Sequence, residues 1–426
     1  MKSGWNTTIL GLTPSVRRSA RLDGDNGWDL AERGGADHGG TLMFLRILRW
    51  LLFWPLGAGL LLSHAVLLLA AHTGRGRLFA IAGCAAGLGL ILAGVTGERR
   101  RTWQRWGTIG AFLLGVVGLG IVIAWAPDGH TEPSARVQNR YVGGKWDYWR
   151  YALGNLVPEL DQFRLGFRLV SRLDPLFDEA QAVRLSGWTT AIYDELEKDP
   201  AFHALGSAMP HAYENLRGGV AASGHCFLYV PERMNRAEPQ PVLVFLHGSG
   251  GNFKAYTWLL AKVADRVGCV VVAPSFGMGD WRAAESTRLV EAALADAGQV
   301  VAVDRSRLHL MGLSNGGLGV SQIAADAGER FSSLIYLSPV FDEGALMSAR
   351  FAAKGRGRDV LVLSGTQDNR TPFTYVSAEV VRMRAGGAKV ELVEFKDADH
   401  FLFFSHADAV LRRLEAWLAE RIRNVD

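Results

Sequence analysis

Three long apolar runs follow a polar, glycine-rich segment at the start of the chain. They cover residues 50–71, 78–96 and 106–126. A helix of about 20 apolar residues crosses the hydrocarbon core of a bilayer, whereas a buried core helix is normally shorter and more interrupted. A signal peptide would account for one such run but not for three. The pattern predicts a disordered segment at residues 1–42 and three transmembrane helices within residues 43–126.

Arginines beside the runs predict the orientation of these helices. Arg46 and Arg49 precede the first run and several arginines fill the second loop, whereas only Arg75 and Arg77 lie in the first loop. Because cytoplasmic loops carry the excess of basic residues, the N-terminus and the second loop are placed in the cytoplasm. The chain after the third run then lies outside a cell (inner) membrane. Met43 opens the basic-then-apolar pattern, and a natural translation start there is a separate hypothesis.

Residues 127–214 are interpreted as a linker followed by a helical connector or cap. Residues 144–185 alternate aromatic and charged side chains at roughly helical spacing, as at Trp146, Trp149 and Leu153. Helices with this pattern either lie on a membrane surface or cover a neighbouring domain. Packing against the next domain is slightly favoured, and both interpretations are kept.

From about residue 215 to residue 426, short apolar runs alternate with amphipathic stretches. The runs are rich in valine and leucine and are expected to be strands: 225–230, 242–247, 269–273, 308–311, 334–337, 360–363 and 390–395. The stretches between them are expected to be helices: 256–267, 281–297, 317–327 and 375–385. This alternation predicts an α/β domain whose mostly parallel sheet is covered by helices on both faces. In such sheets the site lies beyond the carboxyl ends of the strands.

A serine stands between an expected strand and the next helix, in Gly312-Leu313-Ser314-Asn315-Gly316. A nucleophile exposed on so sharp a turn needs small flanking residues, because neighbouring backbone passes close. The helix N-terminus behind the serine favours developing negative charge. A tight glycine turn with a capping serine is the alternative, and the strand-to-helix position favours the nucleophile.

A glycine-rich loop, His247-Gly248-Ser249-Gly250, follows another expected strand. Such a loop can turn backbone N–H groups towards a substrate oxygen and form half of an oxyanion hole. The N–H of Ser249 is the first choice for this donor and that of Gly250 the second, while Asn315 would supply the other donor. A phosphate-binding loop is not favoured, because the P-loop and dinucleotide-binding motifs are absent.

Asp368 and His400 each follow an expected strand near the C-terminal end of the chain. His400 would be the general base towards Ser314, and Asp368 would accept a hydrogen bond from its Nδ1–H and fix the tautomer. The chain order Ser, Asp, His is that of a serine-hydrolase triad on a parallel sheet. An Asx turn is the alternative role for Asp368. Three other aspartates are rival acids: Asp342, Asp397 and Asp399.

Residues 215–424 resemble an α/β-hydrolase. The serine turn and the glycine loop are similar to those of esterases that include polyhydroxyalkanoate depolymerases and feruloyl-type esterases. The motif Gly365-Thr366-Gln367-Asp368 with the later Asp-His pair is similar to dienelactone hydrolases and prolyl-oligopeptidase-like peptidases. The early antiparallel strands of this fold are hard to find before Ser223, so a shortened sheet is expected. The membrane region has no counterpart in the secreted esterases.

The implied activity is hydrolysis of a carboxylic ester through an acyl-serine, without a metal or an organic cofactor. The expected partners are a small-molecule or lipid-like ester and, along residues 50–126, membrane lipids. Nucleic acid is not an expected partner, because the arginines form no basic stripe despite the net charge of +4. The oligomeric state stays open. Apolar residues near Phe276, Met278 and Trp281, and near Phe401, are expected to shape the pocket.

Two other functions are weighed against ester hydrolysis. A prolyl-oligopeptidase-like peptidase is less favoured, because residues 127–214 are too few and not repetitive enough for a β-propeller. A non-catalytic, hydrolase-like membrane binding protein is less favoured because serine, aspartate and histidine are all present. Cys226 and Cys269 open two strands expected to be neighbours, and two buried free thiols are favoured over a disulfide between them.

Overall fold

The computed structural model describes residues 37–95, 102–129, 131–142, 150–216, 223–281 and 285–423. The chain divides into two compact units, residues 1–52 and 53–426. Residues 1–36 of the segment predicted to be disordered lie outside the described residues. Its end differs from the prediction, because residues 37–42 already belong to the first helix.

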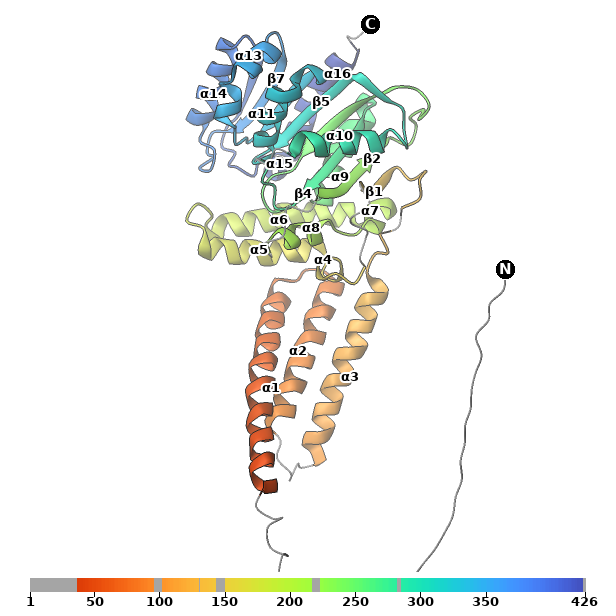
Figure 1. The fold of residues 1–426 in the computed structure, drawn as a ribbon, viewed down its shortest axis with the longest axis vertical. Helices are drawn as coiled ribbons and strands as arrows, with labels where there is room; N and C mark the ends of the chain where they lie inside the picture. The colour runs from red at the N-terminus through yellow and green to blue at the C-terminus, as the bar shows by residue number, and fades with distance from the viewer. Residues whose placement is uncertain are drawn as a thin grey trace, which may run out of the picture. The chain divides into compact units, whose positions relative to one another are not determined.

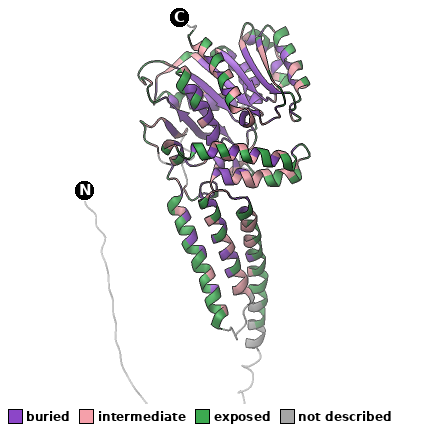
Figure 2. Cartoon of the chain, turned by 180° about the vertical axis from the view of Figure 1, so that it is seen from behind, coloured by how far each residue is buried: buried purple, intermediate pink, exposed green. Residues whose placement is uncertain are grey.

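Three long helices correspond to the predicted membrane region (Figure 1). They are α1 (Asp37–Ala70), α2 (Gly74–Val95) and α3 (Thr102–Trp125). Each contains a stretch that is long and apolar enough to cross a membrane: Ile47–Ala70, Gly74–Gly94 and Thr102–Trp125. Exposed residues run along the three helices (Figure 2). Their exposed large apolar side chains include Leu62, Leu69, Val116 and Val117. Exposed leucine and valine at this density suit hydrocarbon rather than water as the surrounding medium.

Small residues bring these helices close together. A Cβ added at Gly57 would lie 2.7 Å from the carbonyl oxygen of Gly87, and one added at Gly87 would lie 2.8 Å from that of Gly57. Only glycine allows this approach, which is typical of helix packing in membranes. The ring of His64 on α1 fills the space beside Gly83 on α2, so this histidine faces the neighbouring helix.

Eight strands form one sheet in the order β1-β2-β4-β3-β5-β6-β7-β8. Their bounds are β1 Val137–Tyr141, β2 Ser223–Tyr229, β3 Gln240–Leu246, β4 Val270–Phe276, β5 Val303–Leu313, β6 Ser333–Leu337, β7 Asp359–Gly365 and β8 Lys389–Phe395. The pairs β1–β2 and β2–β4 are antiparallel, and all other neighbours are parallel. The seven strands predicted from the sequence are all present.

Side chains alternate between two cores, one on each face of the sheet. Along β3, Leu243 and Phe245 enter one core, whereas Val242 and Val244 enter the other. This alternation follows from the period of two along a strand. The first core is covered mainly by α5 (Glu159–Leu173), α6 (Glu179–Leu196), α9 (Lys254–Val267) and α16 (Ala407–Arg423). The second is covered mainly by α10 (Ser286–Ala297), α11 (Gly316–Ala327), α13 (Ala349–Gly355) and α14 (Phe373–Ala385).

Shorter helical segments connect these elements. They are α4 (Leu153–Leu156), α7 (Pro200–Ala204), α8 (Met209–Leu216), the 3-10 turn η1 (Gly328–Arg330), α12 (Glu343–Leu346) and α15 (Leu402–Ser405).

The sheet is not shortened, so that expectation is wrong. Strand β1 lies in the segment interpreted as a linker, and its residues Val-Gln-Asn-Arg-Tyr carry almost no apolar pattern. The polar side chains have partners far along the chain. Asn139 donates to the carbonyl oxygen of Leu205, and Arg140 forms an ion pair with Asp296, with 2.7 Å between Nε and Oδ2. Because those partners exist only in the folded chain, the sequence pattern does not reveal this strand.

Cys226 and Cys269 are free and buried, as favoured from the sequence. Their strands β2 and β4 are neighbours, but Cys226 lies opposite Pro274 in the antiparallel register. Cys226 belongs to one core and Cys269 to the other. The two thiols therefore lie on opposite faces of the sheet.

Candidate active site

Ser314 occupies a strained turn between β5 and α11. Its φ angle is +50°, in the left-handed region that residues other than glycine seldom adopt. A Cβ added at Gly312 would lie 2.4 Å from the carbonyl oxygen of Gly316, and one at Gly316 would lie 2.1 Å from that of Leu246. Both flanking glycines are thus required by close backbone contact, which is the geometry of a nucleophile elbow.

A chain of two hydrogen bonds joins Ser314, His400 and Asp368. The distance from Ser314 Oγ to His400 Nε2 is 2.9 Å, and that from His400 Nδ1 to Asp368 Oδ2 is 2.8 Å. His400 follows β8 and Asp368 follows β7, so both lie at carboxyl ends of strands beside the turn that carries Ser314. The structure brings together all three residues that the sequence singled out.

The carboxylate of Asp368 is buried and fully engaged. Its Oδ1 accepts from the backbone N–H groups of Arg370 and Thr371, and its Oδ2 accepts from Thr371 Oγ1 at 2.7 Å and from His400. Burial alone would raise the pKa of Asp368. The hydrogen bonds from His400 and Thr371 and the charge of His400 outweigh burial, so its pKa lies below the ordinary value. The carboxylate is therefore ionised at neutral pH, and it faces His400 Nδ1.

The three rival aspartates have other partners. Asp342 caps α12 by accepting from Ala345 N–H, and it also accepts from Gln322. Asp397 accepts from Gln367 Nε2. Asp399 accepts from Phe401 N–H, and its other oxygen accepts from Gln181 on α6. These three aspartates therefore have partners other than His400, and Asp368 is the carboxylate that contacts His400 Nδ1.

The glycine-rich loop lies against the serine turn. A Cβ added at Gly248 would lie 3.2 Å from both Leu313 O and Ser314 Cβ. Of the two donors considered on this loop, Gly250 is not available, because its N–H donates to the carbonyl oxygen of Met278 at 3.0 Å. Among the described residues, the N–H groups of Ser249 and Asn315 donate to no protein acceptor. Gly250, the second choice from the sequence, is thus ruled out as an oxyanion donor. The N–H groups of Ser249 and Asn315 stay candidates for this role.

His247 holds this loop in place, a role that the sequence did not suggest. Its Nδ1 is 2.8 Å from the carbonyl oxygen of Gly248, and its Nε2 accepts from Phe276 N–H at 3.0 Å. Burial lowers its pKa to about 4, so the ring is neutral and carries its proton on Nδ1. The Nε1–H of Trp281 donates to His247 O at 2.7 Å. Trp281 is fully buried, so it belongs to the core beneath the loop and not to a pocket wall.

The connector covers the loops that carry Asp368 and His400. Phe177, in the turn between α5 and α6, packs on Phe401 with 5.4 Å between ring centroids. Asp174 in the same turn forms an ion pair with Arg370, which lowers the pKa of Asp174. Of the two interpretations of this segment, covering the catalytic domain is therefore supported directly.

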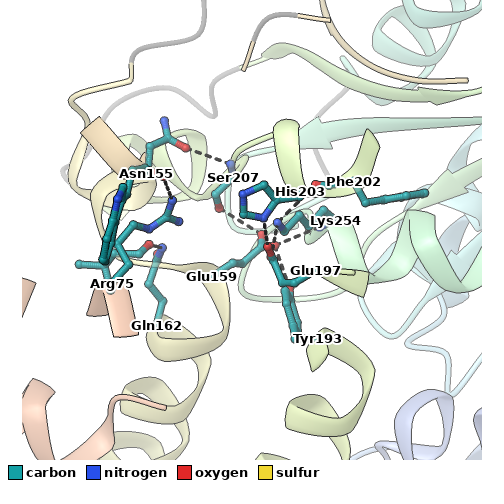
Figure 3. Close-up of polar contacts among 12 residues, drawn as sticks. Arg75, Asn155, Glu159, Gln162, Tyr193, Glu197, Phe202, His203, Ser207 and Lys254 are labelled. Carbon is teal, nitrogen blue, oxygen red and sulfur yellow. Dashed lines mark hydrogen bonds and ion pairs between the residues drawn. The ribbon is translucent and has the colours of Figure 1, made fainter. Parts of the chain in front are cut away.

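A buried polar cluster fastens the connector to the N-terminus of α9 (Figure 3). Glu159 of α5 accepts from Tyr193 Oη at 2.8 Å, from Ser207 Oγ at 3.1 Å and from Lys254 N–H at 3.3 Å. Burial raises the pKa of Glu159 to about 7, against the opposing effects of Lys254 and these hydrogen bonds. Lys254 Nζ lies 2.6 Å from Oε1 of Glu197, the residue that directly follows α6. Because α9 follows the glycine-rich loop, the cluster anchors that loop to the connector.

A cavity of about 530 Å³ lies beside this cluster. It is lined by residues of the loop between α1 and α2, the start of α2, the end of α3 and the connector: His72, Thr73, Arg75, Trp125, Pro158, Leu160, Tyr193, Asp194, Glu197 and His203. No triad residue lines it, so it is separate from the site at Ser314. No group of three or more His, Cys, Asp or Glu placed to bind a metal occurs in the part of the chain that the structure describes.

Comparison with known proteins agrees with this fold. The sequence model described as "Alpha/beta hydrolase family" matches residues 243–359. No curated protein matches the chain in sequence.

Solved structures that resemble the chain include three hydrolases. A thermostable esterase is 20% identical, with a TM-score of 0.38 over 46% of this chain and 59% of that protein, less than two thirds of its length. The fluorophosphonate-binding serine hydrolase FphF of Staphylococcus aureus is 15% identical, with a TM-score of 0.39 over 47% of this chain and 94% of that one. The S-formylglutathione hydrolase of Agrobacterium tumefaciens is 20% identical, with a TM-score of 0.38 over 46% and 90%. The family match over residues 243–359 and the eight-stranded, mostly parallel sheet confirm the predicted α/β-hydrolase fold.

Proposed function

We propose that this protein is a membrane-anchored serine hydrolase that cleaves carboxylic esters through an acyl-serine. The observation that carries the proposal is the continuous hydrogen-bond chain from Ser314 Oγ through His400 to the buried carboxylate of Asp368. A serine hydroxyl is a weak nucleophile unless an adjacent base removes its proton, and a third group must orient that base.

The proposed reaction has two halves. Ser314 Oγ bonds to the ester carbonyl carbon while its proton passes to His400 Nε2, and the carbonyl oxygen becomes an oxyanion. When the bond to the alkoxy oxygen breaks, His400 returns the proton and the alcohol leaves. Water then attacks the acyl-serine with His400 again as base, which releases the carboxylic acid and restores Ser314. Asp368 keeps the proton of neutral His400 on Nδ1 and stabilises the imidazolium that forms in each half.

The oxyanion is proposed to be held by the backbone N–H groups of Ser249 and Asn315. The loop with Ser249 packs on Ser314 through Gly248, and Asn315 follows the nucleophile at the start of α11. Preorganised donors at this position stabilise charge that develops in the transition state and cost no reorganisation. The neutral ring of His247 keeps the loop at its distance from the nucleophile.

The membrane arrangement is part of the proposal. The arginine distribution favours a catalytic domain on the extracytoplasmic side of the cell (inner) membrane. We propose the division into residues 1–42, 43–126, 127–214 and 215–426 with two changes: residues 37–42 join the first helix, and β1 is the part of the third segment that joins the catalytic sheet.

Ester hydrolysis is favoured over the two alternatives. The described residues of the 127–214 segment form one strand and helices, an arrangement that does not suit the β-propeller of prolyl-oligopeptidase-like peptidases. A non-catalytic binding protein has no need for a strained serine that is hydrogen-bonded to a histidine. Backbone strain of this kind persists where the surrounding structure and function require it.

Labelling with a fluorophosphonate probe tests the proposal. The full chain in detergent or nanodiscs should react at Ser314 and release p-nitrophenol from p-nitrophenyl esters, and Ser314→Ala should abolish both. A matched control is Ser405→Ala, at the end of α15, which should label like the wild type. Absence of Ser314-dependent labelling would overturn the hydrolase proposal. Faster cleavage of aminoacyl amides than of esters would favour the peptidase, and protection of residues 215–426 from protease in intact cells would overturn the topology.

A further inference from the structure

Helix α5 has one face that is buried against the catalytic domain. Phe163 packs on Phe253 with 4.1 Å between ring centroids, and Phe167 packs on Phe177 at 6.1 Å. Leu160 is buried in the same core. The spacing of these residues, 160, 163 and 167, defines one stripe of a helix. The remaining residues of α5 lie outside this stripe and are mostly half-buried or exposed.

Near its N-terminus, this remaining face contacts the ends of the membrane helices. Arg164 Nε donates to Ala70 O, the last residue of α1, at 2.9 Å. Leu165 packs against a small apolar cluster that includes Leu67 and Ala80. Asp161 accepts from the backbone N–H groups of His72 and Thr73, in the loop between α1 and α2. Through these contacts, the face of α5 that carries Arg164 and Leu165 lies against the end of α1 and the start of α2.

The same face continues along α5, and none of the residues that the structure describes covers it. Residues four positions apart lie on one side of a helix, so Arg168 and Arg172 extend the stripe of Arg164, and Leu169 and Leu173 extend that of Leu165. Leu169 is 46% exposed and Leu173 is 83% exposed. Both arginines are exposed as well. We call Arg168, Leu169, Arg172 and Leu173 the basic-apolar face.

The charge on this part of the helix has a single sign. Between residues 162 and 173 the sequence contains three arginines and no acidic residue. A helix that presents leucine and arginine side by side is typical of one that lies in a membrane interface, where the leucines enter the acyl boundary and the arginines meet anionic headgroups. The stripe begins on residues that end membrane helices, so it is continuous with the membrane-facing surface of the same chain.

We infer that the basic-apolar face of α5 lies in the interface of the bilayer and binds anionic phospholipids. The helix then has two partners, the catalytic domain on one side and lipid on the other. The turn that follows α5 carries Asp174 and Phe177, which contact Arg370 and Phe401 beside the triad. Docking α5 on the bilayer therefore places the loops of Asp368 and His400 directly above the membrane surface.

The inference is tested by measuring where Leu173 lies, which requires no enzymatic activity. The full chain with Cys84→Ala and Leu173→Cys is labelled with an environment-sensitive fluorophore and reconstituted in nanodiscs that contain phosphatidylglycerol. Val381→Cys on α14, where the native valine is 62% exposed, is the matched control. Lipids with a nitroxide near the headgroup should quench the label at 173. The apolar surroundings at the interface should shift the emission of this label to shorter wavelength. Aqueous iodide should quench the label at 381.

The charge of the face is tested in the same samples. Replacing Arg168 and Arg172 together by glutamine should reduce lipid quenching at 173, with a larger reduction in phosphatidylglycerol than in phosphatidylcholine discs. Unchanged thermal unfolding of each variant checks folding. Iodide quenching at 173 as strong as at 381 would overturn the inference. Protection of 173 from both quenchers would also overturn it, because it would indicate a protein on this face. Neither result depends on whether Ser314 is catalytic.

Discussion

Phe177 and Phe401 meet edge to face, with ring centroids 5.4 Å apart and an angle of 64° between the rings. One belongs to the connector that follows the membrane helices, and the other directly follows His400 in sequence. The guanidinium of Arg370, two residues after Asp368, lies 5.9 Å from the Phe177 ring centroid. Phe177 thus contacts both loops that carry the proposed triad residues Asp368 and His400.

Replacing Phe177 by alanine should lower kcat more than it changes KM. The ring is buried, so its loss should destabilise the fold by about 3–5 kcal/mol and free the His400 loop to move. Steady-state kinetics on p-nitrophenyl esters and denaturant unfolding measure the two effects. The control is Leu176→Ala, because Leu176 is exposed and should matter little to either quantity. A rise in KM with unchanged kcat would contradict a positioning role.

Asp368→Asn should reduce kcat by about 10⁴-fold while the fold persists, because an amide does not hold His400 in the required tautomer. Asp399→Asn should stay close to wild type, since its side-chain oxygen can still accept from Phe401 N–H. Comparison of the two variants in the same esterase assay decides which carboxylate serves the base. A larger loss for Asp399→Asn would reverse the assignment.

Gly316→Ala should abolish activity and lower the unfolding temperature. Its Cβ would lie 2.1 Å from Leu246 O, a backbone atom at the end of β3 that cannot yield without displacing the strand. Gly187→Ala on α6 is the control, because nothing lies within 4 Å of its added Cβ. There the change should stabilise the helix by up to about 1 kcal/mol. Active, stable Gly316→Ala would show that the elbow tolerates a side chain.

Ser249→Ala should keep nearly full activity, because the proposed donor is the backbone N–H and not the hydroxyl. Gly250→Ala should lose activity, since Gly250 has a φ angle of +100° that a Cβ would strain. Both variants are measured by kcat and by the rate of fluorophosphonate labelling. A severe loss in Ser249→Ala alone would indicate a role for its hydroxyl.

Glu159→Gln should flatten the dependence of stability on pH. Burial raises the folded pKa of Glu159 to about 7 from 4.5, so between these values the folded chain holds a proton that the unfolded chain has released. Stability should therefore fall as pH rises from about 4.5 to 7 and stay lower above that, by on the order of 3 kcal/mol. Glutamine removes this titration. The difference in unfolding free energy between variant and wild type should therefore shift in favour of the variant when the pH rises from about 5 to about 8. Parallel unfolding curves of both proteins across the window would contradict the raised pKa.

The sequence by itself determined the features that depend on local pattern. Apolar length predicted three helices able to span a membrane, and alternation of short apolar runs with amphipathic stretches predicted seven strands and the parallel sheet. The elbow glycines could be recognised from the sequence, because backbone crowding at Gly312 and Gly316 allows only glycine at these positions. Ser314, Asp368 and His400 were singled out as candidates because each follows a strand.

Only the tertiary structure decided the features that depend on partners distant in sequence. Strand β1 is polar and was missed, because Arg140 and Asn139 are satisfied by Asp296 and Leu205. Gly250 was ruled out as a donor by the carbonyl oxygen of Met278, which no spacing reveals. The contact of Phe177 with Phe401 joins residues more than two hundred positions apart. The period of hydrophobic residues is a property of neighbouring positions in the sequence. Hydrogen-bond partners and ring contacts form only when the chain folds and brings distant residues together.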